Sequence, residues 1–83
     1  MRPEVSLVKH LLSILQRIGP AGLEEQSLMI EMEVAHGRPL TTAAARDAMV
    51  WCVDHAWIGS RRDDFDRTIY WLRSEGKTIL AGL

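Results

Sequence analysis

The chain has 83 residues, of which 47% are hydrophobic and 25% are charged, and its formal net charge is −1. This length accommodates a single domain and excludes two independent cores. The one cysteine, Cys52, excludes an internal disulfide and is typical of a reducing compartment. No apolar run approaches the roughly 20 residues of a membrane-spanning helix. We therefore expect a cytoplasmic protein without membrane contacts, and the near-neutral charge by itself attracts neither nucleic acid nor an acidic membrane.

The first half of the chain predicts two helices. Over residues 3–18 apolar side chains recur at helical spacing, and Pro3 suits a first helical turn because its missing N–H needs no partner there. The pair Gly19-Pro20 ends this pattern. Residues 23–36 begin with acidic residues, which favour a helix N-terminus, and end before a glycine. The side chains expected to be buried on this second helix are Leu28, Met32 and Ala35.

A third helix is predicted to begin after Pro39 and to end near His55 or Ala56. Thr41 or Thr42 is its expected N-cap. Its buried stripe is expected to consist of Ala45, Met49, Cys52 and Ala56, with Ala48 and Val53 beside them. At 100° per residue, the opposite side of this helix carries Ala43, Asp47, Val50, Trp51 and Asp54.

The remaining chain predicts a small antiparallel sheet. Residues 57–60 and 67–72 are β-branched and aromatic runs joined by a polar tip, which is the pattern of a β-hairpin. Residues 38–40 could supply a short first strand. Residues 74–83 look like a short closing helix or a turn. The expected fold class is α+β, with three helices and a two- or three-stranded antiparallel sheet in a single domain spanning residues 1–83.

This order of elements resembles a winged-helix domain of the helix-turn-helix class, of the kind found in bacterial and phage transcription regulators. The most specific part is "HAWIGSRRDDFDRTIYWLRSEGKTIL", residues 55–80. In that family an arginine- and aspartate-bearing wing runs into a Tyr-x-Leu-Thr-x-x-Gly-Arg pattern. This sequence matches it at Tyr70, Leu72, Glu75, Gly76 and Lys77, with Arg73 and Ser74 where the family often has threonine and a variable residue. Tyr70 and Leu72 share one strand face and are expected to pin the strand to the helices, and Gly76 is expected to let the backbone turn.

The resemblance implies a recognition helix over residues 41–55 and a wing over residues 60–67. In such domains the start of the recognition helix enters the major groove, and arginine can bind a phosphate or a guanine edge through two hydrogen bonds. The implied function is sequence-specific binding of double-stranded DNA by a small, dimeric transcription regulator. The expected DNA contacts are Thr41, Thr42, Arg46, Ser60, Arg61, Arg62 and Arg67.

The local charges oppose this function. Three arginines between residues 60 and 67 are matched by three aspartates, and between residues 41 and 56 Arg46 stands against Asp47 and Asp54. Affinity for duplex DNA comes largely from the counterions released when basic side chains neutralise phosphates. A monomer should therefore bind DNA weakly, whereas a homodimer would double the contacts.

The outer face of the third helix supports an alternative function. A tryptophan on the side of a helix usually needs cover. Trp51 is either packed under the N-terminal segment or the wing, or it anchors another chain together with Val50. In the second case the protein is a winged-helix module for protein–protein contact that binds no DNA. Trp57 and Trp71 are expected to pack against each other or against the helices.

The sequence predicts neither a catalytic residue, a cofactor nor a metal site. Cys52 and His55 are three residues apart on a helix, but the other half of a zinc site would have to come from His10 or His36 on separate elements. The aspartates of residues 63–66 lie at an expected exposed tip beside arginines, where nothing tunes a carboxylate for acid–base chemistry. We therefore expect a protein that is not an enzyme.

Overall fold

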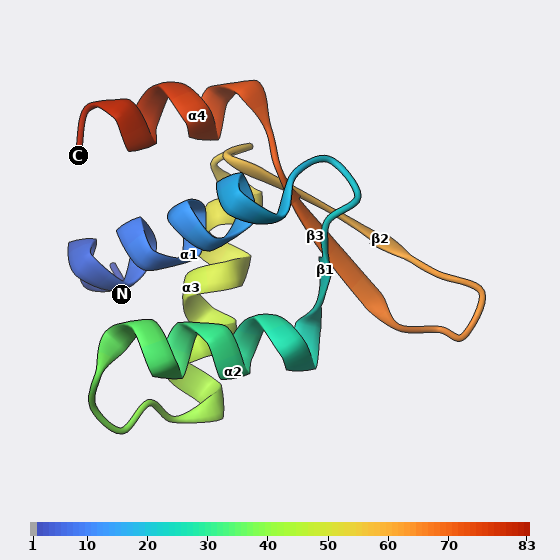
Figure 1. Cartoon of the computed structure of the whole chain (residues 1–83), viewed down its shortest axis with the longest axis horizontal. Helices are drawn as coiled ribbons and strands as arrows, with labels where there is room; N and C mark the ends of the chain where they lie inside the picture. Colours follow the sequence, from blue (N-terminus) through green and yellow to red (C-terminus); the bar gives the residue numbers. More distant parts are fainter. Residues whose placement is uncertain (1) are drawn as a thin grey trace.

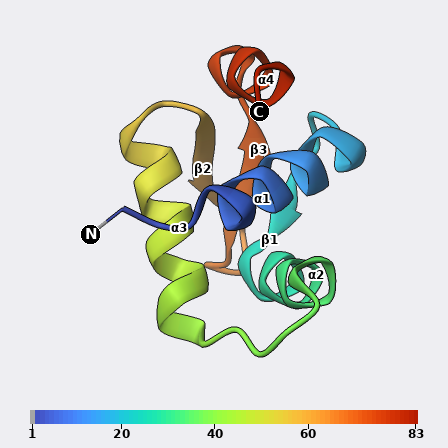
Figure 2. The same cartoon turned by 90° about the vertical axis from the view of Figure 1, so that its left-hand side faces the viewer.

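A computed structural model describes residues 2–83. The elements in chain order are α1 (Val5–Ile18), β1 (Leu23–Glu24), α2 (Glu25–His36), α3 (Thr42–Asp54), β2 (Ile58–Arg62), β3 (Thr68–Leu72) and α4 (Ser74–Ala81). Figure 1 shows α1 between α4 and α2, with the β2–β3 hairpin projecting away from the helices. In Figure 2, α3 lies beside α1, against which it packs. The α+β class is confirmed, but the expected number of three helices is wrong because the closing segment forms a fourth helix, packed on α1.

The sheet is antiparallel and has the order β1-β3-β2. The expected first strand at residues 38–40 is wrong, because these residues belong to the connection between α2 and α3, and Pro39 has no N–H to give to a ladder. The first strand is β1 instead, with Leu23 opposite Tyr70. The preceding Gly22 has a φ of 78°, and a Cβ there would lie 2.4 Å from the carbonyl oxygen of Tyr70. A glycine is therefore needed for β1 to approach β3.

The β2–β3 hairpin is confirmed, although β2 ends two residues later than expected and β3 begins one residue later. Ile58 lies opposite Leu72 and Arg62 lies opposite Thr68. The expected wing, residues 60–67, therefore consists of strand residues as far as Arg62 and of a tip at residues 63–67. At the base of the hairpin the indole of Trp71 lies over Gly59. A Cβ at residue 59 would come within 2.3 Å of the indole, so this position requires a glycine.

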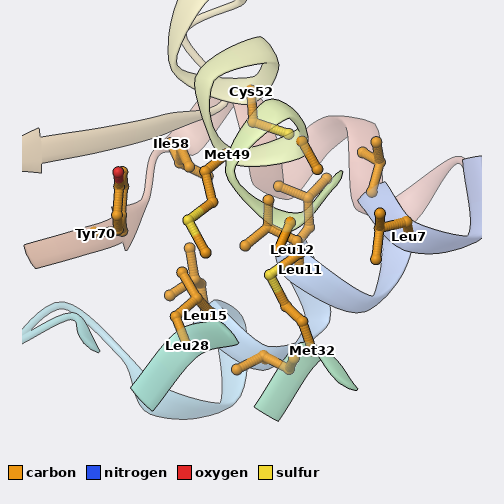
Figure 3. Close-up of a cluster of buried hydrophobic side chains, with 14 of the residues drawn as sticks. Leu7, Leu11, Leu12, Leu15, Leu28, Met32, Met49, Cys52, Ile58 and Tyr70 are labelled. Carbon is orange, nitrogen blue, oxygen red and sulfur yellow. The ribbon is translucent and has the colours of Figure 1, made fainter. Parts of the chain in front are cut away.

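The core lies where the three longer helices meet the base of the hairpin. Figure 3 shows leucines of α1 between Leu28 and Met32 of α2 and Met49 and Cys52 of α3, with Tyr70 closing the side toward the sheet. Tyr70 and Leu72 are both buried, as predicted for one face of the strand. Ala35 is exposed, so the buried stripe of α2 is one turn shorter than expected.

The helix boundaries differ from the expectations for Pro3 and Gly76. Glu4 is the N-cap of α1, so Pro3 precedes the helix and does not form part of its first turn. Gly76 lies inside α4, where a Cβ would approach the carbonyl oxygen of Trp57 to 2.1 Å. Its role is therefore close packing of α4 on the start of β2 and not a turn of the backbone. Gly19, with a φ of 91°, ends α1 as predicted. No helix within residues 2–83 has the length and apolar character needed to cross a membrane.

Candidate nucleic-acid interface

The start of α3 is fixed by a side-chain cap. Thr41 is the N-cap, as one of the two alternatives predicted, and its Oγ1 accepts a hydrogen bond of 3.1 Å from the backbone N–H of Ala44. Thr42 is the first helical residue and is exposed. The cap uses only an acceptor lone pair of Thr41, so the O–H groups of both Thr41 and Thr42 can donate to a ligand at this helix end.

Arg46, one turn further along α3, is held by an acidic residue of α2. Its Nε and Nη2 both lie 3.0 Å from Oε1 of Glu25. The Arg46 side chain is 53% exposed, whereas the Glu25 side chain is only 18% exposed. The pair therefore has a solvent-facing cation over a largely covered carboxylate.

Tyr70 places this pair next to the hairpin. Burial raises the pKa of the Tyr70 hydroxyl, the charge of Glu25 raises it further, and the charge of Arg46 opposes the rise. Both charges therefore lie close enough to the phenol to influence it. Ser60 of β2 is the residue opposite Tyr70 in the sheet. Tyr70 is thus influenced by Arg46 and Glu25 from the helices and is paired with Ser60 within the hairpin.

The tip of the hairpin is organised by Asp63. Its Oδ1 accepts hydrogen bonds from the backbone N–H groups of Phe65 and Arg67, at 2.9 and 2.8 Å, and its Oδ2 accepts from Nε of Arg67 at 2.8 Å. The backbone N–H of Arg67 contributes most to lowering the pKa of Asp63, desolvation opposes the shift, and the Arg67 side chain and Phe65 N–H add to it. Phe65 itself is 79% exposed, with the Arg67 guanidinium 5.3 Å from its ring centroid. The sequence analysis did not single out Phe65, because one aromatic within a charged run has no periodicity that marks it.

The other arginines of the hairpin differ in their partners. Nη1 of Arg62 lies 2.9 Å from both the backbone oxygen and Oδ1 of Asp66. Within residues 2–83, Arg61 forms no ion pair. Of the predicted basic residues, Arg46, Arg62 and Arg67 are each paired with a carboxylate of the same chain. The Arg62–Asp66 pair is exposed at both partners, and such pairs contribute about 0–1 kcal/mol, whereas the carboxylates of Glu25 and Asp63 are largely covered.

The predicted partner residues lie at the other end of α3. Val50 is 50% exposed. Trp51 is half-buried, stacked on His55 at 3.8 Å between ring centroids and in edge contact with Trp57 at 5.0 Å. Part of its cover thus comes from neighbouring aromatic rings. Trp57 packs on Trp51, and Trp71 packs over Gly59 at the base of the hairpin.

A comparison with solved structures identifies the fold. SSV1 F-93 superposes with a TM-score of 0.75, covering 98% of this chain and 84% of that chain, at 17% sequence identity. The chain has a winged-helix-like fold. In this fold α3 takes the place of the recognition helix and the β2–β3 hairpin is the wing. No protein-family model matches the chain, and no curated protein matches it.

The winged helix also has an apolar surface next to the predicted DNA contacts. On α2, Ile30 and Val34 are 66% and 72% exposed. Together with Leu40 they line a shallow hollow of about 240 Å³ that extends to Thr41 and Thr42 at the start of α3. Apolar side chains in this position do not contribute to phosphate binding, and they are a feature that a DNA-binding role leaves unexplained.

Proposed function

We propose that this winged-helix protein binds double-stranded DNA and acts as a small transcription regulator. The observation that supports the proposal is the winged-helix-like fold, in which Arg46 on α3 and the arginines of the β2–β3 hairpin are exposed. In the proposed complex, Thr42 and Arg46 contact DNA from the recognition helix, and Arg61 and Arg62 contact it from the wing. A duplex bound in this way would contact helix and wing together, as expected of this architecture.

The chemistry of the interface is simple charge and hydrogen-bond exchange. Phosphates would take the places of Glu25 and Asp66 beside the arginines, and the Thr42 hydroxyl at the helix start would hold a further phosphate. Each chain offers only a few such contacts, so affinity depends on two copies binding together. We propose a homodimer on DNA and no catalytic role.

Binding of a fluorescently labelled duplex, followed by anisotropy over a range of salt concentrations, tests the proposal. Arg46→Ala and Arg61→Ala should each weaken binding, and Arg61→Ala should reduce the slope of log K against log salt by about 1. Lys9→Ala is the matched control, because Lys9 is an exposed cation on α1, away from the proposed interface. Absence of binding at low salt, or equal losses in the Lys9 and Arg61 variants, would contradict the proposal.

A second candidate function is protein–protein contact without DNA binding. The hollow lined by Ile30, Val34 and Leu40 favours it, since it places apolar surface where phosphates would otherwise be expected. In this case the labelled duplex does not bind at low salt. Sedimentation would instead show association that persists at high salt and that is lost in Val34→Glu but retained in Glu33→Gln.

A further inference from the structure

Phe65 lies at the tip of the β2–β3 hairpin with its ring in solvent. It is 79% exposed, more than any other large apolar side chain within residues 2–83. The tip is carried away from the helices by the two strands of the hairpin (Figure 1). We propose that Phe65 inserts between two base pairs of the bound duplex, and that this insertion makes binding prefer flexible pyrimidine–purine steps. The inference rests on the proposed function, because it gives the wing a role within DNA binding.

Backbone hydrogen bonds hold the ring at a fixed place on the tip. Oδ1 of Asp63 accepts from the N–H groups of Phe65 and Arg67. In addition, the N–H of Asp63 donates to the carbonyl oxygen of Arg67 at 2.9 Å, and the N–H of Asp66 donates to the carbonyl oxygen of Asp63 at 3.0 Å. These bonds close residues 63–67 on themselves, so Phe65 moves mainly about its side-chain torsions. A side chain held in this way loses little conformational freedom when it binds.

The residues around the ring favour a base step over a protein surface as its partner. Phe65 is the only apolar residue between residues 60 and 67, and both of its chain neighbours are aspartates. The core of a protein–protein interface is depleted of charged residues and gathers several large side chains. A base step, in contrast, accepts a single apolar side chain between two planar surfaces, with polar edges and phosphates around it. A lone ring on a charged tip matches this second arrangement.

The charges of the hairpin tip are balanced within the tip itself. Arg67 pairs with Asp63 and Arg62 pairs with Asp66. The three arginines and three aspartates of residues 61–67 sum to zero, so this wing gains little affinity from the release of counterions. The Arg67 guanidinium also lies 5.3 Å from the centroid of the Phe65 ring, which brings a cation to the same place. Stacking of the ring on a base needs no net charge, and it is therefore the contact that a neutral wing can offer.

The cost of inserting a side chain depends on the DNA sequence. An apolar wedge partly unstacks the two base pairs that it separates. Pyrimidine–purine steps such as TpA unstack and kink easily, whereas purine runs such as A-tracts are stiff. Insertion of Phe65 would therefore give the protein a sequence preference at a step where it makes no hydrogen bond to a base.

Two duplexes of equal length that carry the fluorescent base 2-aminopurine test the insertion. In the first, the analogue replaces the adenine of a single central TpA step in an otherwise purine strand. In the second, a purine replaces that thymine, so the duplex contains no pyrimidine–purine step. The fluorescence of the analogue rises when its stacking is lost. At saturating concentration the wild type should raise the fluorescence of the first duplex, and it should bind this duplex about tenfold more tightly than the second, the effect of one base–aromatic stack.

Variants of Phe65 separate stacking from charge. Phe65→Ala should bind the TpA duplex about tenfold more weakly than the wild type and leave its fluorescence at the level of free DNA. The slope of log K against log salt should not change, because no charge is removed. Phe65→Tyr keeps a ring and should retain both the affinity and the rise in fluorescence. Val5→Ala shortens a side chain on α1 that is 59% exposed, and as the control it should bind like the wild type.

The outcomes distinguish this inference from the proposed function. Binding of the wild type without a rise in fluorescence, or wild-type affinity in Phe65→Ala, would overturn the inference and leave the proposed function standing. Absence of binding to either duplex at low salt would contradict both. Self-association of the protein that is lost in Phe65→Ala would also overturn the inference, because a second copy would then cover the ring.

Discussion

Arg46 on α3 and Glu25 at the start of α2 are joined through a single carboxylate oxygen, which lies 3.0 Å from two nitrogens of the guanidinium. The pair connects the two helices of the helix-turn-helix unit. It also neutralises Arg46, the one basic residue of α3. In the proposed function, the affinity for DNA is therefore reduced by a carboxylate of the protein itself.

Replacing Glu25 with glutamine should strengthen DNA binding about fivefold, a change of roughly 1 kcal/mol, because Arg46 then needs no exchange of partners. Anisotropy of a labelled duplex measures the change. Glu33→Gln removes the same charge from an exposed position on the same helix, where no arginine is bonded within residues 2–83. An equal gain in both variants would show that only net charge matters.

The wing offers a similar comparison. Asp66→Asn should release Arg62 and strengthen DNA binding several-fold, whereas Asp64→Asn, with the same charge change and no ion pair among the described residues, should have a smaller effect. Asp66 has a φ of 61°, a left-handed conformation that asparagine tolerates well, so the substitution should preserve the loop. Similar affinities for the two variants would show that Arg62 does not reach the duplex.

The packing of α4 predicts a sharp difference between two glycines. Gly76→Ala should destabilise the fold by about 1–3 kcal/mol, because a Cβ would lie 2.1 Å from the Trp57 carbonyl oxygen and the helix must shift. Gly82→Ala should have little effect, since the nearest atom to its Cβ is 3.6 Å away. Chemical denaturation of both variants, compared with the wild type, measures the difference.

Cys52 should be chemically inert in the folded protein. Its side chain is fully buried, and burial raises the pKa of its thiol to about 12. Since the thiolate is the reactive form, a thiol reagent such as DTNB should react at neutral pH only as fast as the protein opens. The rate should rise steeply in denaturant. Rapid reaction under native conditions would mean that α3 separates from the core far more easily than its packing implies.

The pH dependence of the wing follows from Asp63. Its pKa is lowered in the folded state, mainly by the backbone N–H of Arg67, so its ionised form stabilises the fold above the unfolded-state pKa. This contribution is lost as the pH falls below about 4 and through the folded-state pKa. The stability difference between the wild type and Asp63→Asn should therefore be largest near neutral pH and shrink in acid. Thermal unfolding at a series of pH values measures it.

The sequence was sufficient for the elements with strong periodicity or distinct end signals. The apolar spacing of α1, a threonine cap at residue 41 or 42 and the β-branched and aromatic runs of the hairpin reflect local preferences, and these were predicted. The strand β1 was not, because two residues carry no pattern and its pairing depends on Gly22 approaching the distant Tyr70. The role of Gly76 was missed for the same reason, since its neighbour in space is the carbonyl of Trp57.

The candidate site was predictable as a list of residues and not as an arrangement. Matching counts of arginine and aspartate indicated a neutral wing, and the pairs of Arg62 and Arg67 with Asp66 and Asp63 bear this out. The pairing of Arg46 with Glu25 could not be foreseen, because the two residues are 21 positions apart and meet only when α2 and α3 cross.

Strand β2 is a free edge of the sheet, since the order β1-β3-β2 leaves its outer side without a partner strand. Such edges invite pairing with other molecules, and natural proteins discourage this with charged side chains. Arg61 and Arg62, both exposed on β2, meet that need whether or not they ever contact a phosphate. Substituting both would therefore be expected to promote aggregation, and solubility must be measured before a loss of DNA binding in such a double variant is interpreted.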